Sequence, residues 1–261
     1  MRKYLFVLVV ILVFLLGSIF LKFNNNIFLF SSYQGFVVEG DTIIKYNNFG
    51  GNVVIPSSID GVIIKKIGDY AFSNLEIDSV TIPNSIKEIG SYAFSNNNIS
   101  NLFIPDSVDI IGEGAFMHNK ISSLSINSNT FLSNACFNDN LMETNSFFYS
   151  SSNMNEVISY GGKVKGNIVL PNNIEIIGEK AFLDTGIVSI EIPSTISTIK
   201  SNAFSGNNLV ELYIPNTVKD ISSDAFSNND YLMEIFVDNN SSSIINSPWG
   251  AEFSNVFWTK K

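Results

Sequence analysis

The sequence is organised around one unit that recurs along most of its length. Residues 82–104, IPNSIKEIGSYAFSNNNISNLFI, begin with Ile-Pro, continue through Ile-Gly and Ala-Phe, and end in an Asn-rich turn and a short apolar strand. A single unit cannot bury its own apolar face, and self-similarity at a period of about 20–50 residues indicates a stacked solenoid. The opening dipeptides are Ile55-Pro56, Ile82-Pro83, Ile104-Pro105, the degenerate Ile126-Asn127, Leu170-Pro171, Ile192-Pro193 and Ile214-Pro215.

The residue types of the unit predict how the coils stack. Proline has no N–H for a β-ladder, so each Leu-x-Ile-Pro is predicted to be a short strand that ends at a corner. Strands of successive coils are expected to pair in parallel, about 4.8 Å apart. The small alanine allows close approach of neighbouring coils, and the phenylalanine is expected to stack into an internal spine. The Asn runs are predicted to be turns. The Ala-Phe pairs are Ala71-Phe72, Ala93-Phe94, Ala115-Phe116, Ala181-Phe182, Ala203-Phe204 and Ala225-Phe226.

Breaks in the pattern divide the repeats into two modules. The coil after Ile126 loses its proline and glycine, and its Ala-Phe becomes Cys136-Phe137. Residues 142–153 interrupt the pattern, and the residues that open the first module return at 156–160 and 166–171. We therefore expect a restarted second module.

Segment boundaries follow from these breaks. Residues 41–46 and 50–56 predict a strand pair that caps the open edge of the solenoid, and residues 60–66 predict a small inserted hairpin. Residues 244–258 abandon the period and carry both tryptophans, which predicts a C-terminal cap, with an aromatic ligand site as the alternative. The predicted segments are a tether at 22–32, a capped first module at 33–143, a connector at 144–155, a second module at 156–243 and a C-terminal cap at 244–261.

The N-terminus predicts the compartment. Residues 4–21 (Tyr4 to Leu21) contain no charge, and a helix of this length spans about 27 Å, close to the hydrocarbon core of a bilayer. Arg2 and Lys3 predict a cytoplasmic stub at 1–3 and an exported repeat region. A single-pass signal-anchor of the bacterial cytoplasmic membrane is preferred, because the exit from this segment is a poor cleavage site. A cleaved signal with secretion, and a buried core helix, are the alternatives.

Composition and motifs argue against nucleic-acid binding and catalysis. The net charge is −9 with 15 Lys and Arg, whereas nucleic acid requires a basic footprint. Cys136 is the only cysteine and replaces the repeat alanine, so we expect a buried thiol and no internal disulfide. His118 is the only histidine and is expected in a solvated turn. A catalytic triad could use only this histidine, and no other residue in the sequence is placed to complete one. We therefore expect no enzyme, cofactor, metal or small-molecule substrate.

Partner binding is expected on the outer face of the Leu-x-Ile strands, where the residue between the apolar positions faces solvent. Exposed aromatic rows are typical of interfaces. Tyr213 and Phe236 should be neighbours flanked by acidic residues, which suits a basic protein or a glycan; ordinary β-propensity at half-exposed positions is the alternative. The middle positions are Thr81, Phe103, Ser125, Glu191, Tyr213 and Phe236, and two residues earlier lie Ser79, Asn101, Ser123, Ser189, Glu211 and Glu234. The candidate partner-binding residues are Phe103, Glu191, Glu211, Tyr213, Glu234 and Phe236.

The unit resembles the BspA-like bacterial leucine-rich repeat. The matching residues are Ile-Pro-x-Ser-Ile/Val-x-x-Ile-Gly-x-x-Ala-Phe followed by Leu-x-x-Leu-x-Ile, over about residues 40–258, and Ser-Pro-Trp-Gly-Ala at 247–251 is similar to the closing segment of related exported proteins. The resemblance implies a right-handed repeat solenoid with a parallel β-sheet on one face and short turns or 3-10 segments on the other. Here one N-terminal transmembrane helix is expected to precede it.

Two functions are therefore expected, both without catalysis. The first is a surface-exposed protein that mediates binding or adhesion to a protein or glycan through the sheet face, which the resemblance to surface-attachment proteins also implies. The alternative is a structural envelope scaffold or spacer that self-associates. The membrane contact is expected only through Tyr4 to Leu21, and no nucleic acid is expected as a partner.

Overall fold

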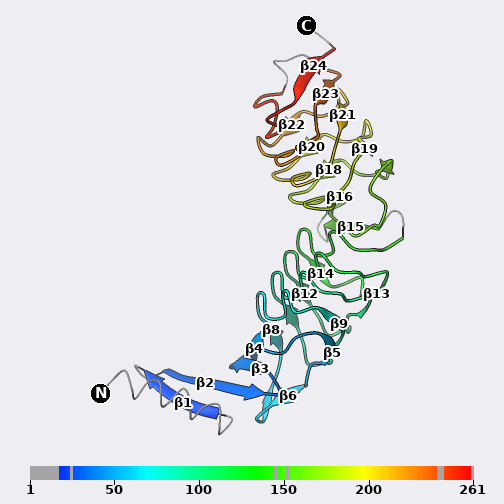
Figure 1. The fold of residues 1–261 in the computed structure, drawn as a ribbon. Coiled ribbons are helices and arrows are strands. Elements are labelled where there is room, and N and C mark those ends of the chain that lie inside the picture. Colours follow the sequence, from blue (N-terminus) through cyan, green and yellow to red (C-terminus); the bar gives the residue numbers. More distant parts are fainter. Residues whose placement is uncertain (1–17, 24–25, 144–145, 151–152, 240–243, 260–261) are drawn as a thin grey trace.

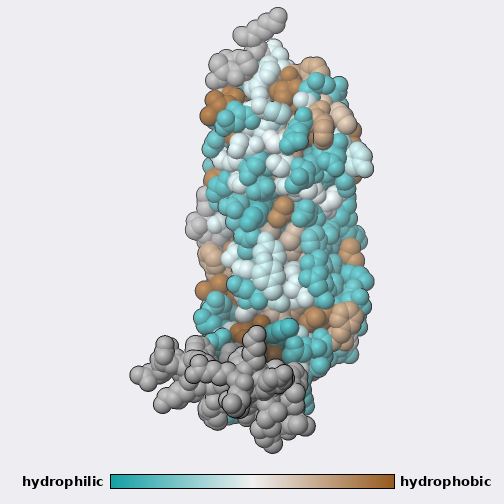
Figure 2. Space-filling model, turned by 60° about the vertical axis from the view of Figure 1, so that its left-hand side comes forward, coloured by the Kyte–Doolittle hydropathy of each residue, from teal (hydrophilic) through white to brown (hydrophobic). Residues whose placement is uncertain are grey.

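The structure is a computed structural model that describes residues 18–23, 26–143, 146–150, 153–239 and 244–259. Figure 1 shows one elongated stack of coils, with antiparallel strands at the N-terminal end and strand β24 at the other. On the face drawn in Figure 2, hydrophilic and neutral residues cover most of the described stack, and hydrophobic residues form separate spots. The apolar repeat residues are accordingly buried inside.

Two sets of parallel strands run along the stack, one from the Leu-x-Ile segments and one from the Ile-Gly segments. The first set comprises β5 (Gly51–Val54), β9 (Ile77–Thr81), β11 (Asn101–Phe103), β13 (Ser123–Ser125), β17 (Ile168–Val169), β19 (Ile190–Glu191), β21 (Glu211–Ile214), β23 (Glu234–Val237) and β24 (Asn255–Trp258). The second set comprises β8 (Lys66–Ile67), β10 (Glu88–Ile89), β12 (Ile110–Ile111), β14 (Phe131–Leu132), β16 (Asn153–Tyr160), β18 (Ile176–Ile177), β20 (Thr198–Ile199) and β22 (Asp220–Ile221).

The parallel solenoid is confirmed, but its second face differs from the prediction. Turns or 3-10 segments were expected there, whereas β10 pairs in parallel with both β8 and β12. The near-constant coil length brings each Ile-Gly into register with the next, so that Ile89 lies opposite Ile67 and Ile111. Two residues per coil are enough to continue the β-ladder, because its backbone hydrogen bonds join neighbouring coils rather than residues of one coil.

The N-terminal end is an antiparallel meander. Strands β1 (Ser18–Phe23), β2 (Asn26–Tyr33), β3 (Phe36–Glu39) and β4 (Thr42–Tyr46) pair in order, and β4 pairs in parallel with β8. Within the predicted tether at 22–32, the described residues 22–23 and 26–32 therefore lie in strands of this meander. Gln34 and Gly35 both have positive φ in a two-residue loop, the geometry that joins hairpin strands, and this turn was not recognised in the sequence.

Two further N-terminal predictions meet the structure differently. In the predicted transmembrane segment, residues 4–17 lie outside the described residues, and residues 18–21 belong to β1 rather than to a helix. Among the described residues no helix has the length and apolar content needed to cross a membrane. The predicted pairing of 41–46 with 50–56 is wrong, because β4 pairs with β3 and β8 while β5 pairs with β9.

The inserted hairpin is confirmed. Strands β6 (Ser58–Ile59) and β7 (Val62–Ile63) pair in antiparallel around Asp60 and Gly61, both at positive φ. An Asp-Gly pair is favoured at such two-residue turns.

An internal phenylalanine spine is confirmed. Phe72, Phe94, Phe116 and Phe137 stack with ring centroids 4.8, 5.2 and 5.7 Å apart, and all four are fully buried. In the second half Phe182, Phe204 and Phe226 stack at 5.1 and 5.6 Å. Trp249, also fully buried, packs edge-on against Phe226 at 6.3 Å and closes the spine.

Two adjacent phenylalanines join the two halves of the spine. Strand β15 (Phe147–Ser150) pairs in antiparallel with β16, so the predicted connector at 144–155 is largely a hairpin. Successive residues of a strand face opposite sides. Phe148 therefore packs on Phe137 at 4.6 Å, while Phe147 lies 6.3 Å from Phe182. The buried apolar residues form one cluster on each side of this hairpin.

Buried asparagines form a second internal column. The Asn97 oxygen accepts hydrogen bonds from the N–H groups of Leu75 and Ile77, and its amide donates to the carbonyls of Phe72 and Phe94. The Asn runs were predicted to be turns, and this describes only part of their role. Asn96 has positive φ in the turn, but its neighbour Asn97 is buried. The column consists of Asn97, Asn119, Asn140, Asn207 and Asn229.

Replacing one member of this column tests its contribution to stability. Asn97→Ala leaves buried backbone groups of two coils without partners, which we expect to lower the free energy of unfolding by at least about 2 kcal/mol. Asn98→Ala is the matched control, because the Asn98 side chain makes no hydrogen bond to a described residue. Guanidinium denaturation of both variants measures the effect. Equal losses would contradict an internal role for Asn97.

Candidate interaction surface

The outer face of β21, β23 and β24 carries the predicted patch. The three strands pair in parallel in the order β21, β23, β24. Glu211 lies opposite Glu234 and Tyr213 opposite Phe236, and on the other side of β23 Glu234 lies opposite Asn255 and Phe236 opposite Phe257. The alternate residues of β21, Leu212 and Ile214, are buried. The period of two thus separates core residues from surface residues along each strand.

Three aromatic rings form a stacked ladder on this surface. The Tyr213 and Phe236 centroids are 4.9 Å apart at an interplanar angle of 14°, and Phe236 and Phe257 are 5.1 Å apart at 18°. Tyr213 is 61% exposed and Phe257 is 43% exposed, so the ladder is open to solvent. We call Tyr213, Phe236 and Phe257 the aromatic ladder. It confirms that Tyr213 and Phe236 are neighbours.

Carboxylates line the ladder without compensating cations. Glu211 and Glu234 are directly opposite each other, and like charges in this position repel. Within the described part of the chain, no ion pair includes Glu191, Glu211 or Glu234. A hydrogen bond with Glu211, partial desolvation and the charges of Glu211 and Glu234 raise the pKa of Tyr213 above its ordinary value.

The structure does not bring all predicted residues together. Phe103 is 62% exposed but lies on β11, which pairs with β13 of the first module, outside the sheet of the ladder. Glu191 lies on β19, one coil before Tyr213. Phe257 was missed, although Asn255-Val256-Phe257 has the same alternation as Glu234-Ile235-Phe236, because the tail lacks the proline and the constant spacing of the repeats.

The residues considered for catalysis are placed differently. Cys136 is fully buried, and burial raises the pKa of its thiol well above the ordinary range, so the thiolate needed for reactivity is suppressed. His118 is not merely a solvated turn residue: its Nδ1 lies 2.9 Å from Asp139, which also pairs with Lys165. Among the described residues, no group of three or more His, Cys, Asp or Glu side chains is arranged to hold a metal ion.

The short parallel strands, the aromatic spine and the asparagine column define a leucine-rich repeat solenoid. The chain belongs to the BspA-type leucine-rich repeat family, whose repeat region matches it in six copies over residues 42–160 and 160–250.

Solved structures of bacterial repeat proteins are similar to this chain. A leucine-rich repeat protein from Eubacterium ventriosum is 19% identical with a TM-score of 0.62, over 78% of this chain and 59% of its own. A leucine-rich cell surface protein from Faecalibacterium prausnitzii is 22% identical with a TM-score of 0.40, over 85% and 55% respectively. The chain thus spans somewhat more than half the length of these two proteins. No curated protein matches the chain.

The raised pKa of Tyr213 provides a test of the patch electrostatics. Glu211→Gln keeps the side-chain shape but removes the negative charge that favours the neutral phenol, so the pKa of Tyr213 should fall toward its ordinary value. Tyrosine ionisation is titrated spectrophotometrically in the wild-type and Glu211→Gln proteins, each with and without Tyr213→Phe. The difference within each pair reports the Tyr213 phenol alone. A Tyr213 titration that is the same in both backgrounds would show that Glu211 does not act on it.

Proposed function

We propose that the protein is a non-catalytic, surface-exposed binding protein that captures a protein or glycan partner through the second module. The observation that carries the proposal is the aromatic ladder, exposed and edged by Glu211 and Glu234. Aromatic residues are enriched at protein interfaces, whereas a row of them on free surface exposes apolar area to water.

Charge favours a partner with basic groups. Glu211 and Glu234 repel each other across the sheet, and a Lys or Arg of the partner placed between them relieves that repulsion. Apolar contact with the ring edges then contributes most of the affinity, while the carboxylates mainly determine orientation and association rate.

The proposed location is the outside of a bacterial cell. Support comes from the family membership and from the Faecalibacterium prausnitzii neighbour, which is described as a cell surface protein. Residues 4–21 are proposed to retain the chain at the cytoplasmic membrane, with release after signal cleavage as the alternative. Fractionation followed by N-terminal sequencing distinguishes the two.

Removing the ladder should abolish capture. Tyr213→Ser combined with Phe236→Ser removes two stacked rings that make no core contact, so the fold should persist while partner retention from an envelope or host-matrix extract falls below detection. Tyr70→Ser is the matched control, because Tyr70 is also 61% exposed and stacks on Tyr92 at 5.2 Å, but lies on an Ala-Phe turn. Undiminished capture by the folded double variant would refute the proposal.

A second function, a scaffold that self-associates, is favoured by one feature. Strand β24 is the last strand of its sheet and pairs only with β23 among the described strands, which leaves one edge open for another chain. Light scattering of the purified full-length chain separates the two functions: concentration-dependent oligomers without capture of other molecules support the scaffold.

A further inference from the structure

The column of turns ends in an open position. In earlier coils the second residue after the spine phenylalanine donates its N–H to the next coil, as Asp184 does to Ser205 and Gly206 does to Ser227, both at 3.0 Å. The equivalent N–H of Asn228 bonds to no described residue. After the final turn around Trp249 the chain continues with Glu252 and Phe253, where earlier coils supply a buried asparagine.

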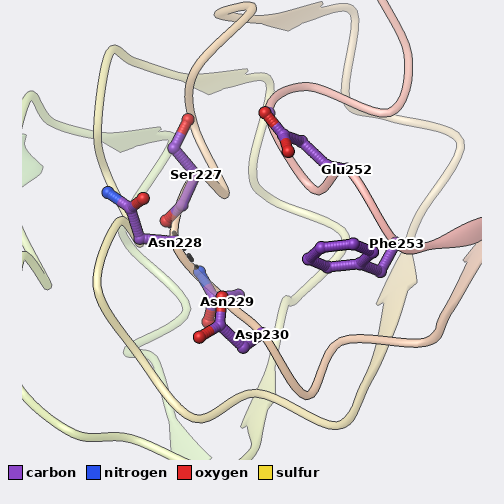
Figure 3. Close-up of a pocket in the computed structure, with 7 residues that line it drawn as sticks. Ser227, Asn228, Asn229, Asp230, Glu252 and Phe253 are labelled. Carbon is purple, nitrogen blue, oxygen red and sulfur yellow. Dashed lines mark hydrogen bonds between the residues drawn. The ribbon is translucent and has the colours of Figure 1, made fainter.

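This open position is a cavity of about 190 Å³. Figure 3 shows the Phe253 ring extending into it from one side, between Glu252 and the Asn229–Asp230 turn. Gly250 packs closely against Ser227 in the cavity wall, because a Cβ there would lie 2.2 Å from Ser227 Oγ, and its φ of +85° is in the left-handed region. The lining residues include Ser227, Asn228, Asp230, Gly250, Glu252 and Phe253.

The groups around the cavity are free to bind. Phe253 is 66% exposed, whereas most aromatic side chains of the stack pack on a neighbour. Asp230 and Glu252 make no hydrogen bond or ion pair with any described residue. One aromatic ring, two acceptor carboxylates and one backbone donor therefore surround the same small space.

We propose that this cavity binds a single pyranose ring of a glycan. The apolar C–H face of the sugar packs on Phe253, and its hydroxyls donate to Asp230 and Glu252 while one accepts from the Asn228 N–H. A hydroxyl is both donor and acceptor and so satisfies both kinds of group, whereas an amine would leave the N–H unpaired. The carboxylates disfavour an anionic ligand, and the polar lining disfavours an apolar one. The site is separate from the aromatic ladder and does not depend on it.

Saturation-transfer difference NMR on the full-length chain tests the proposal. The probes are the methyl glycosides of glucose, galactose, mannose and N-acetylglucosamine, in a zwitterionic detergent without a sugar headgroup. At least one should receive saturation, strongest at the C–H groups of one ring face. Phe253→Ala should abolish the signal, and the isosteric Asp230→Asn should weaken affinity by about ten-fold through loss of a charged acceptor.

The matched control is Tyr231→Ala, which removes an aromatic ring that is 61% exposed but does not line the cavity. It should leave the saturation unchanged. Absence of saturation for every glycoside, equal saturation in the folded Phe253→Ala variant, or displacement of the glycoside by N-acetyl-lysine methylamide would overturn the assignment. The double variant with Tyr213→Ser and Phe236→Ser changes no residue that lines the cavity, so its glycoside saturation should be unchanged even where capture by the ladder is lost. The two proposals can therefore fail independently.

Discussion

The whole stack depends on hydrogen bonding of the Ala-Phe turn inside the molecule. The turn places backbone carbonyls beside the apolar spine, where an unpaired group costs more than a spine contact contributes. Asparagine amides that bridge neighbouring coils resolve this: Asn207 donates to the carbonyls of Phe182 and Phe204 and accepts from the N–H of Ile187. Since its partners lie in two coils, the amide sets their separation. The phenylalanine rings then stack at the distance that the asparagines allow.

This internal constraint leaves only the outward positions free to vary. Most coils supply alanine, phenylalanine and asparagine at fixed places, together with the isoleucines of two strand faces. Few positions therefore remain that can be substituted without changing the packing of the interior. The middle residue of the Leu-x-Ile strand is one of them, and it ranges from Thr81 through Phe103 to Tyr213. Stacking of equivalent residues follows automatically from the register. Wherever aromatics occupy this position in consecutive coils, they form a ladder.

Repetition explains which features could be predicted from sequence. The parallel coils, the spine of Phe72 to Phe226 and the contact of Tyr213 with Phe236 all follow from residues that recur at equal spacing. The buried role of Asn97 could not be predicted, because asparagine is common in exposed turns and the buried Asn97 stands next to the turn residue Asn96 in the sequence. The Gln34–Gly35 hairpin and the addition of Phe257 to the ladder occur once each. A feature that occurs once produces no periodic pattern in the sequence, so it can be identified only from the strands with which it pairs in the structure.

The junction of the modules shows how the stack survives an interruption of the repeat. Asn138 replaces the usual column contact by donating to the carbonyls of Lys180 and Leu183, while its oxygen accepts from Ser159. Lys180 also pairs with Glu113 at 2.7 Å. Burial alone would raise the pKa of the Glu113 carboxyl, but hydrogen bonds from Lys180 and Tyr92 outweigh burial and hold the pKa below its ordinary value. The ion pair therefore persists at neutral pH and ties two halves whose apolar cores are separate. The interruption changes which residues bridge the coils without breaking the column of hydrogen bonds, so the outward surfaces of both modules remain parts of one continuous stack.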